Sequence, residues 1–165
     1  MRTQDAESPL VELRILSQPR CAAGVRDMIA ALSRRMGFDK AGAGQIALAV
    51  DEAIANVIHH GYNRKEDGPI WVRIYTLDEQ GAVNPRCGDV RAVRIVIEDE
   101  GRQVDPQSIR GRDLDDIRPG GLGVHIIKHY MDDVRFEKRD DAGMKLTMTR
   151  RLDSTKPTAP VSDDR

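Results

Sequence analysis

The chain has 165 residues, of which 39% are hydrophobic, 4% are aromatic and 32% are charged, and its net charge is −1. This length suits a single domain with an aliphatic core. The balanced charge argues against a nucleic-acid-binding surface, so we expect no direct nucleic acid partner. The longest aliphatic run, residues 46–50, is far shorter than a membrane span, and we expect no membrane association. With no apolar segment at the start and only two cysteines, the sequence predicts a cytoplasmic protein with free thiols.

The first half of the chain predicts one strand followed by two helices. Residues 1–9 are polar and are expected to form a flexible N-terminus. Residues 11–16 alternate apolar and charged side chains, the pattern of a half-buried strand. Residues 20–36 then change to helical spacing, and a second helix follows the capping residue Asp39 and extends to about His60.

The second half predicts four more strands and one short helix. The helix is expected at residues 124–131, after a segment without periodicity at residues 99–120. A segment of that length inside a compact domain is usually functional. Residues 153–165 have the composition of a disordered tail. The four strands are predicted at residues 70–77, 90–98, 133–138 and 144–152.

The order of these elements predicts the fold class. Strands that follow one another through short hairpins pair in antiparallel fashion. Helices gathered on one face of such a sheet give an α+β fold with two layers, not a doubly wound sheet. We therefore expect one two-layer α/β sandwich, with a mostly antiparallel sheet, over residues 10–152.

The second helix has an unusual polar face. At about 100° per residue, Glu52, Asn56, His59 and His60 fall on one side, opposite an aliphatic stripe. A solvated helix face is the common explanation of such a pattern. However, residues 41–63 contain no Lys or Arg, which are typical of solvated faces, so a functional face stays an alternative.

Two glycine-containing segments are further candidates for a binding site. Asp99 directly follows a predicted strand, and Gly101 allows a sharp turn beside a ligand, although a simple turn has the same composition. Gly121 and Gly123 lead directly into the short helix, where backbone N–H groups can bind an anion; a flexible hinge is the alternative. Neither the dinucleotide fingerprint nor the Gly-Lys-Ser/Thr phosphate loop is present.

Two other catalytic patterns are weaker. His125 and His129 lie four residues apart, as zinc ligands can, but no spacing supplies a third ligand. Ser108 lacks the nucleophile-elbow sequence that a serine hydrolase needs.

The three polar and glycine segments, in this order, resemble the ATP site of the gyrase, histidine-kinase and MutL superfamily, whose domain is the Bergerat or histidine-kinase-like ATPase fold. Glu52-x-x-x-Asn56 resembles its N box, and Asp99-x-Gly101 and Gly121-x-Gly123 resemble its two glycine boxes. Thr147 stands where the superfamily has a late threonine near the adenine. The segments 51–62 and 120–128 are similar to RsbW-like anti-sigma factors, which are serine-protein kinases.

The resemblance implies a role for each matched residue. Asn56 would coordinate Mg²⁺, Glu52 would act as the general base, and Asp99 would accept a hydrogen bond from the adenine amino group. The cofactors implied are ATP and magnesium. The remaining nucleotide-binding residues implied are His60, Gly101, Arg118, Gly121, Leu122, Gly123 and Thr147.

The resemblance also implies an activity and partners. We expect phosphorylation of a serine or threonine on an antagonist protein, sequestration of a sigma factor, and a homodimer. Two alternatives stay open: a non-catalytic ATP-binding switch, and an ATPase without a protein substrate.

The sequence departs from the family pattern at one position, because Gln103 stands in place of the second glycine of the first box. Residues 105–120 are expected to form a lid over the phosphates.

Overall fold

The computed structural model describes residues 8–84, 89–109 and 122–152. Its elements follow the predicted order, with a π-helical turn added to the second helix and a short 3-10 helix in the long connection. The elements are β1 (Val11–Leu16), α1 (Pro19–Arg35), α2 (Lys40–Asn56) with the π turn Val57–Gly61, β2 (Pro69–Leu77), β3 (Ala92–Asp99), the 3-10 helix Pro106–Ser108, α3 (Leu122–Tyr130), β4 (Asp133–Lys138) and β5 (Met144–Arg151).

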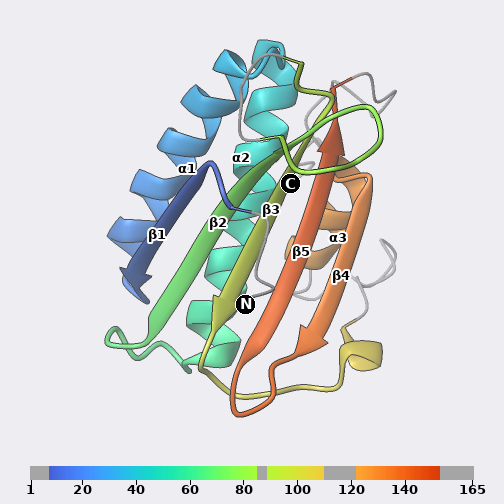
Figure 1. The fold of residues 1–165 in the computed structure, drawn as a ribbon. Helices are drawn as coiled ribbons and strands as arrows, with labels where there is room; N and C mark the ends of the chain where they lie inside the picture. Colours follow the sequence, from blue (N-terminus) through green and yellow to red (C-terminus); the bar gives the residue numbers. More distant parts are fainter. Residues whose placement is uncertain (1–7, 85–88, 110–121, 153–165) are drawn as a thin grey trace, which may run out of the picture.

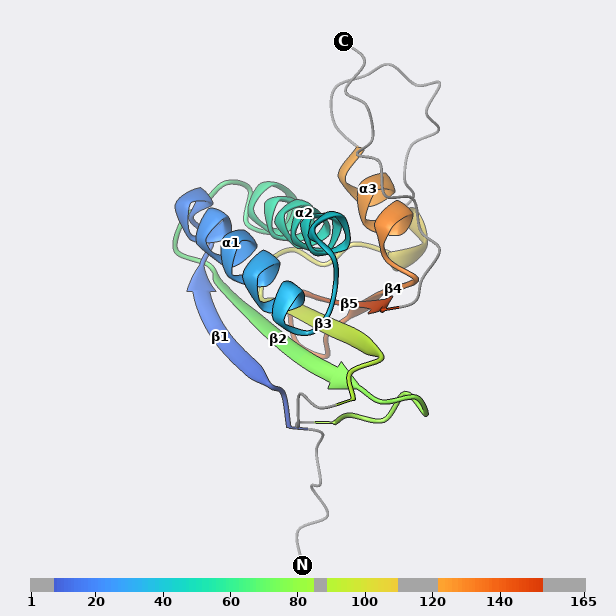
Figure 2. The same cartoon turned by 90° about the horizontal axis from the view of Figure 1, so that it is seen from above.

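The five strands form one antiparallel sheet in the order β1-β2-β3-β5-β4 (Figure 1). All three α-helices lie on one face of this sheet (Figure 2). The expected two-layer α+β sandwich is therefore confirmed. Strand β3 is the middle strand, and a backbone hydrogen bond from Arg102 to Gly61 brings the turn after β3 close to the π turn that follows α2.

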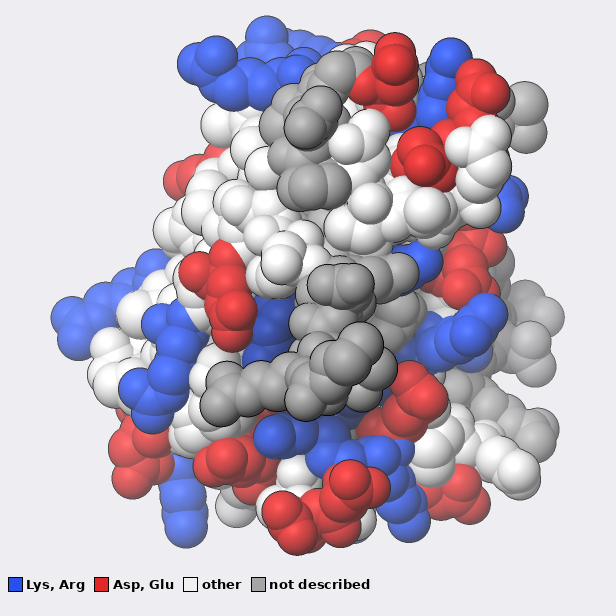
Figure 3. Space-filling model, in the orientation of Figure 1, with Lys and Arg blue, Asp and Glu red and all other residues white. Residues whose placement is uncertain are grey.

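The alternation of side chains along the strands separates the core from an open face. On β2, Ile70, Val72 and Ile74 are buried against the helices, because every second residue points to the same side. The intervening residues face away from the helices, where Arg73 forms ion pairs with Glu12 and Glu98. Figure 3 shows this open face, on which basic and acidic side chains are interspersed.

Helix α2 is the central element of the helical layer. Asp39 caps it by accepting a 2.7 Å hydrogen bond from the backbone N–H of Gly42, as predicted. By length and composition, Lys40–Gly61 would be apolar enough to cross a membrane, since an 18-residue stretch within it has a mean hydropathy of 1.2. Its burial between α1, α3 and the sheet accounts for this apolar character, because a core helix has the same composition.

A buried arginine on strand β5 links helices α2 and α3. Arg150 of β5 is only 4% exposed, and it donates hydrogen bonds to the carbonyl oxygen of Tyr130 and the side-chain oxygen of Gln45, at 2.8 and 3.3 Å. This residue thereby connects the end of α3 to the beginning of α2. Burial lowers the pKa of its guanidinium group.

Several expectations fall wholly or partly outside the described residues. They concern most of the flexible N-terminus, the disordered tail and residues 110–120 of the lid. Of the expected lid, residues 105–109 are described and contain the 3-10 helix, whose start Asp105 caps through the N–H of Gln107.

Candidate active site

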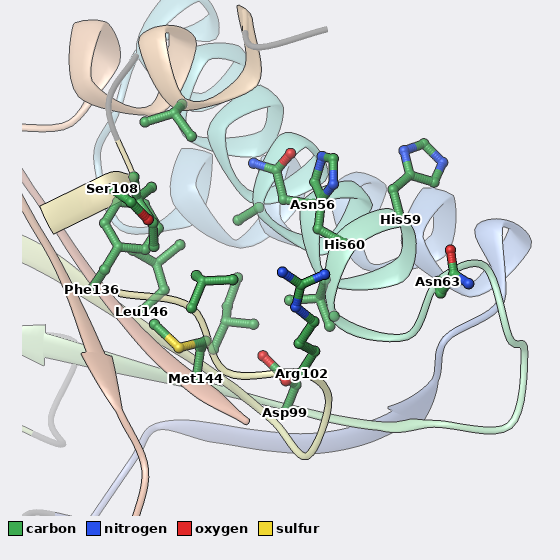
Figure 4. Close-up of a pocket in the computed structure, with 17 residues that line it drawn as sticks. Asn56, His59, His60, Asn63, Asp99, Arg102, Ser108, Phe136, Met144 and Leu146 are labelled. Carbon is green, nitrogen blue, oxygen red and sulfur yellow. The ribbon is translucent and has the colours of Figure 1, made fainter. Parts of the chain in front are cut away.

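A cavity of about 680 Å³ lies between α2, the end of β3, the 3-10 helix and strands β4 and β5. Figure 4 shows its walls: Asn56 and His60 extend from the helix, Asp99 and Arg102 lie beneath them, and Phe136, Met144 and Leu146 come from the sheet. The other described residues that line it are Ala53, Val57, His59, Gly61, Asn63, Ile97, Val104, Ser108, Ile109 and Val124.

The end of α2 and the turn after β3 meet through backbone contact. The N–H of Arg102 donates a 2.9 Å hydrogen bond to the carbonyl oxygen of Gly61. A Cβ atom on Gly101 would lie 2.6 Å from the carbonyl carbon and oxygen of Gly61, which cannot move aside cheaply. Only glycine fits at position 101, and this close approach brings the polar face of α2 over Asp99.

Asp99 is a buried carboxylate at the base of the cavity, only 3% exposed. Its Oδ1 atom accepts a 2.7 Å hydrogen bond from the N–H of Gly101. Burial raises the pKa of the Asp99 carboxyl group, whereas hydrogen bonds from the N–H groups of Gly101 and Met144, and the charge of Arg139, act in the opposite direction. Those three groups favour the ionised carboxylate, which can accept a hydrogen bond from a ligand.

Tyr62 fixes the backbone beside Asp99. Its hydroxyl group donates to the carbonyl oxygen of Pro69 at 2.6 Å and accepts from the N–H of Glu100 at 2.7 Å. Its ring occupies the space where a side chain on Gly68 would lie. The start of β2 and the turn after β3 are thus held to the π turn of the second helix.

Glu52, Asn56 and Gly123 come together where α3 begins against α2. A Cβ atom on Gly123 would lie 2.6 Å from the Oε2 atom of Glu52 and 3.4 Å from both polar atoms of the Asn56 amide. Burial raises the pKa of the Glu52 carboxyl group, and the neighbouring Asp51 carboxylate adds to this effect. A carboxyl group with a raised pKa is better suited to accept a proton during catalysis.

The donor set at this end of the cavity suits a magnesium ion that also binds a ligand. Mg²⁺ prefers oxygen ligands and keeps water and substrate phosphates in its coordination shell, so one amide oxygen such as that of Asn56 can suffice. No group of three His, Cys, Asp or Glu that could hold a metal occurs within the described ranges. His125 and His129 stack at 5.9 Å on α3 without such a group around them.

The structure brings most of the predicted site residues together and separates others. Asn56, His60 and Asp99 line the cavity, and the glycines at 101 and 123 pack against its walls. Leu122 is exposed at the start of α3 and is not among the described residues that line the cavity. Arg118 and Gly121 lie outside the described residues.

The placement of Thr147 beside a bound adenine is wrong. Thr147 pairs with Val96 and Arg135 in the sheet, and its side chain faces the open side with Tyr75 and Thr149. Side chains alternate along β5, so its neighbours 146 and 148 point toward the helices and Thr147 points away.

Sequence reasoning missed Met144, Leu146 and Arg102. The alternation within residues 144–151 was a signal that could have placed Met144 and Leu146 on the side of the helices. Arg102 had no comparable signal, because its side chain belongs to a turn without periodicity. Arg102 is the only arginine or lysine among the described residues that line the cavity, and its side chain lies beside Asp99 (Figure 4).

We predict that Gly101→Ala destabilises the protein because its methyl group would overlap the backbone of Gly61. The expected loss in the free energy of unfolding is about 1–3 kcal/mol, measured by urea denaturation. Gly44→Ala is the matched control, since nothing lies within 4 Å of its Cβ position. In the interior of α2, this control should raise stability by roughly 0.5–1 kcal/mol. Equal stability of Gly101→Ala and the wild type would contradict the close approach.

Comparisons with known proteins indicate the family to which the chain belongs. The profile of a family described as "Histidine kinase-like ATPase domain" matches residues 15–150. The chain is 28% identical over 140 residues to the serine-protein kinase RsbW of Listeria innocua, covering 85% of each chain. It is 23% identical over 151 residues to RsbW of Bacillus subtilis, covering 86% of this chain and 85% of that one.

Two solved structures share the fold. The RsbU and RsbW domains of Rv1364c from Mycobacterium tuberculosis superpose with a TM-score of 0.56 at 20% identity, over 86% of this chain and 31% of that one. The mycobacterial sensor histidine kinase MprB gives a TM-score of 0.50 at 18% identity, over 86% of this chain and 97% of that one. With the profile match over most of its length, the chain belongs to the histidine kinase-like ATPase domain family.

Proposed function

We propose that this protein is a magnesium- and ATP-dependent kinase that phosphorylates a serine or threonine of an antagonist protein, and that it also acts as an anti-sigma factor. The observation that carries the proposal is the convergence of three separate segments on one cavity. Asp99 lies at its base, Asn56 lies on its wall, and Glu52 lies beside Asn56 and Gly123. If the polar face of α2 were only solvated, its side chains would face open water, whereas Asn56 and His60 line a cavity together with the buried Asp99 carboxylate.

The sheet side of the cavity suits an adenine ring. Phe136, Met144 and Leu146 provide an apolar wall, and the Asp99 carboxylate is the hydrogen-bond acceptor at its edge. An exocyclic amino group donates to such an acceptor, whereas guanine presents a carbonyl oxygen at the equivalent position. This chemistry favours adenine over guanine.

The helix side of the cavity suits the phosphates. Asn56 would hold Mg²⁺, which when bound neutralises negative charge on the phosphates. The Arg102 side chain points into the cavity below Asn56 and His60, where it can approach a phosphate or ribose oxygen (Figure 4). We also assign nucleotide contacts to His60, which lines the cavity, and to the glycine at 123, which packs against Asn56.

The proposed chemistry is transfer of the γ-phosphoryl group to a hydroxyl. The acceptor oxygen forms a bond to the γ-phosphorus, the bond from that phosphorus to the oxygen bridging to the β-phosphate breaks, and ADP leaves. The hydroxyl proton passes to the Glu52 carboxylate. A raised pKa keeps Glu52 a stronger base than an ordinary glutamate.

Support for the partners comes from the relatives. The curated relatives are named serine-protein kinases, and the chain covers most of their length. By that likeness, we propose a protein substrate, and a sigma factor as the second partner. We propose a cytoplasmic location, where a sigma factor is present. The free thiol of Cys21 is compatible with this reducing compartment.

We further propose a homodimer, because β1 leaves one edge of the sheet open among the described residues. Light scattering over a dilution series should give about twice the mass of one chain. A monomer at high protein concentration would contradict this proposal.

Asp99→Asn should remove most of the thermal stabilisation that Mg-ATP gives the wild type. The change replaces a charged acceptor with a neutral amide, and hydrogen bonds to charged groups are the stronger ones. The measurement is the unfolding midpoint with and without nucleotide. Glu100→Gln is the control, because this neighbouring carboxylate is exposed and does not line the described cavity. If Asp99→Asn keeps the full ATP-induced shift, Asp99 does not bind the adenine.

Glu52→Gln should separate binding from catalysis. Loss of the general base should lower phosphoryl transfer by roughly 10²–10⁴-fold while ATP affinity stays near that of the wild type. Asn56→Ala should instead weaken both. In the wild type, transfer should fall as the pH drops through the raised pKa of Glu52, because only the ionised carboxylate accepts the proton.

The measurement is a single-turnover assay with γ-labelled ATP and the antagonist protein, beside a titration of ATP affinity. Glu66→Gln, an exposed carboxylate after α2, is the control and should change neither quantity. Transfer at the wild-type rate by Glu52→Gln would leave an ATP-dependent binding switch as the better explanation.

A further inference from the structure

Arg139, in the turn between β4 and β5, contacts both ends of the first glycine box. Its side chain donates a 2.5 Å hydrogen bond to the carbonyl oxygen of Asp99. Its own carbonyl oxygen accepts a 2.6 Å hydrogen bond from the side-chain amide of Gln103. One residue thus holds the segment from Asp99 to Gln103, although it does not line the described cavity.

The role of Gln103 becomes clear from this contact. It stands where the resembling proteins have a second glycine, and its amide joins the box to the β4–β5 turn. The turn itself approaches closely: Gly143 has a φ of +79°, and a Cβ atom there would overlap the carbonyl group of Asp99. The N–H of Arg139 donates to the carbonyl oxygen of Gly143 at 3.1 Å, which closes the turn.

The Arg139 guanidinium is also held from the open face of the sheet. It lies 5.4 Å from the ring centroid of Trp71, and Arg14 of the edge strand lies 5.9 Å from the same centroid. A cation over an indole face is attracted by the electron density of the ring. Trp71 is the single tryptophan of the chain, and it lies opposite Glu98, directly before Asp99 in β3.

We propose that Arg139 is a positioning residue for nucleotide binding: from behind the cavity it fixes the backbone of Asp99, and so orients the carboxylate that receives the adenine. This inference rests on the proposed function. In this arrangement the Trp71 ring holds the Arg139 guanidinium in place, and the Gln103 side chain fixes the end of the glycine box that lies opposite Asp99.

The test is Arg139→Gln, with Arg14→Gln as a matched control. Both changes remove a guanidinium from the same indole, but only Arg139 also bonds to Asp99. For each variant, Mg-ATP affinity is measured by calorimetry, and KM for ATP and kcat are measured for transfer to the antagonist. Arg139→Gln should weaken ATP affinity and raise KM roughly tenfold, the loss expected for one hydrogen bond from a charged donor.

A split between KM and kcat separates positioning from a general structural defect. At saturating ATP, kcat of Arg139→Gln should stay near that of the wild type, because Glu52 and Asn56 belong to α2. Arg14→Gln should leave both parameters unchanged.

Three results would overturn the inference: wild-type ATP affinity in Arg139→Gln, equal losses of affinity in the two variants, or a loss of kcat in Arg139→Gln at saturating ATP. These results differ from failure of the proposed function itself, in which the wild type would bind no ATP.

Discussion

The contact between the backbones of Gly61 and Gly101 determines the geometry on which the rest of the site depends. It joins the end of α2 to the end of β3, because a Cβ atom at position 101 would lie within 2.6 Å of Gly61. The hydrogen bond from Arg102 to the Gly61 carbonyl oxygen keeps the two segments in this register. Two polar groups of the cavity lie close to this junction in the chain: Asn56 comes five residues before Gly61, and Asp99 comes two residues before Gly101.

The two faces of the sheet contribute differently to the site around this junction. The helix-covered face supplies the cavity, its apolar wall and the buried Asp99. The open face supplies Trp71 and, at the β4–β5 turn, Arg139, which bonds to the backbone of Asp99 from outside. Because burial alone raises the pKa of the Asp99 carboxyl group, the hydrogen bonds and the positive charge around it are what favour its ionised form. The site therefore extends beyond the residues that would touch a nucleotide.

Periodicity predicted most of the fold, and the spacing of polar residues predicted much of the site. The strand at Asp133–Lys138 and the capped helix from Lys40 follow directly from local patterns. The meeting of Gly123 with Glu52 depends on the packing of α3 against α2, and it followed from the resemblance, since no single local pattern contains it. The predicted adenine contact of Thr147 was wrong because it was taken from that resemblance, whereas the alternation of side chains along β5 decides which way Thr147 points. The roles of Arg102 and Arg139 arise in turns, where no period indicates the direction of a side chain.

The most direct test of the central claim is a calorimetric titration of the wild-type protein with Mg-ATP and, separately, with Mg-GTP. A cavity with an adenine-reading carboxylate at its base should bind ATP at one site per chain, and it should bind GTP much more weakly. The difference arises because the carbonyl oxygen of guanine would face the Asp99 carboxylate in place of an amino group. No heat with Mg-ATP, or equal affinity for the two nucleotides, would contradict the account.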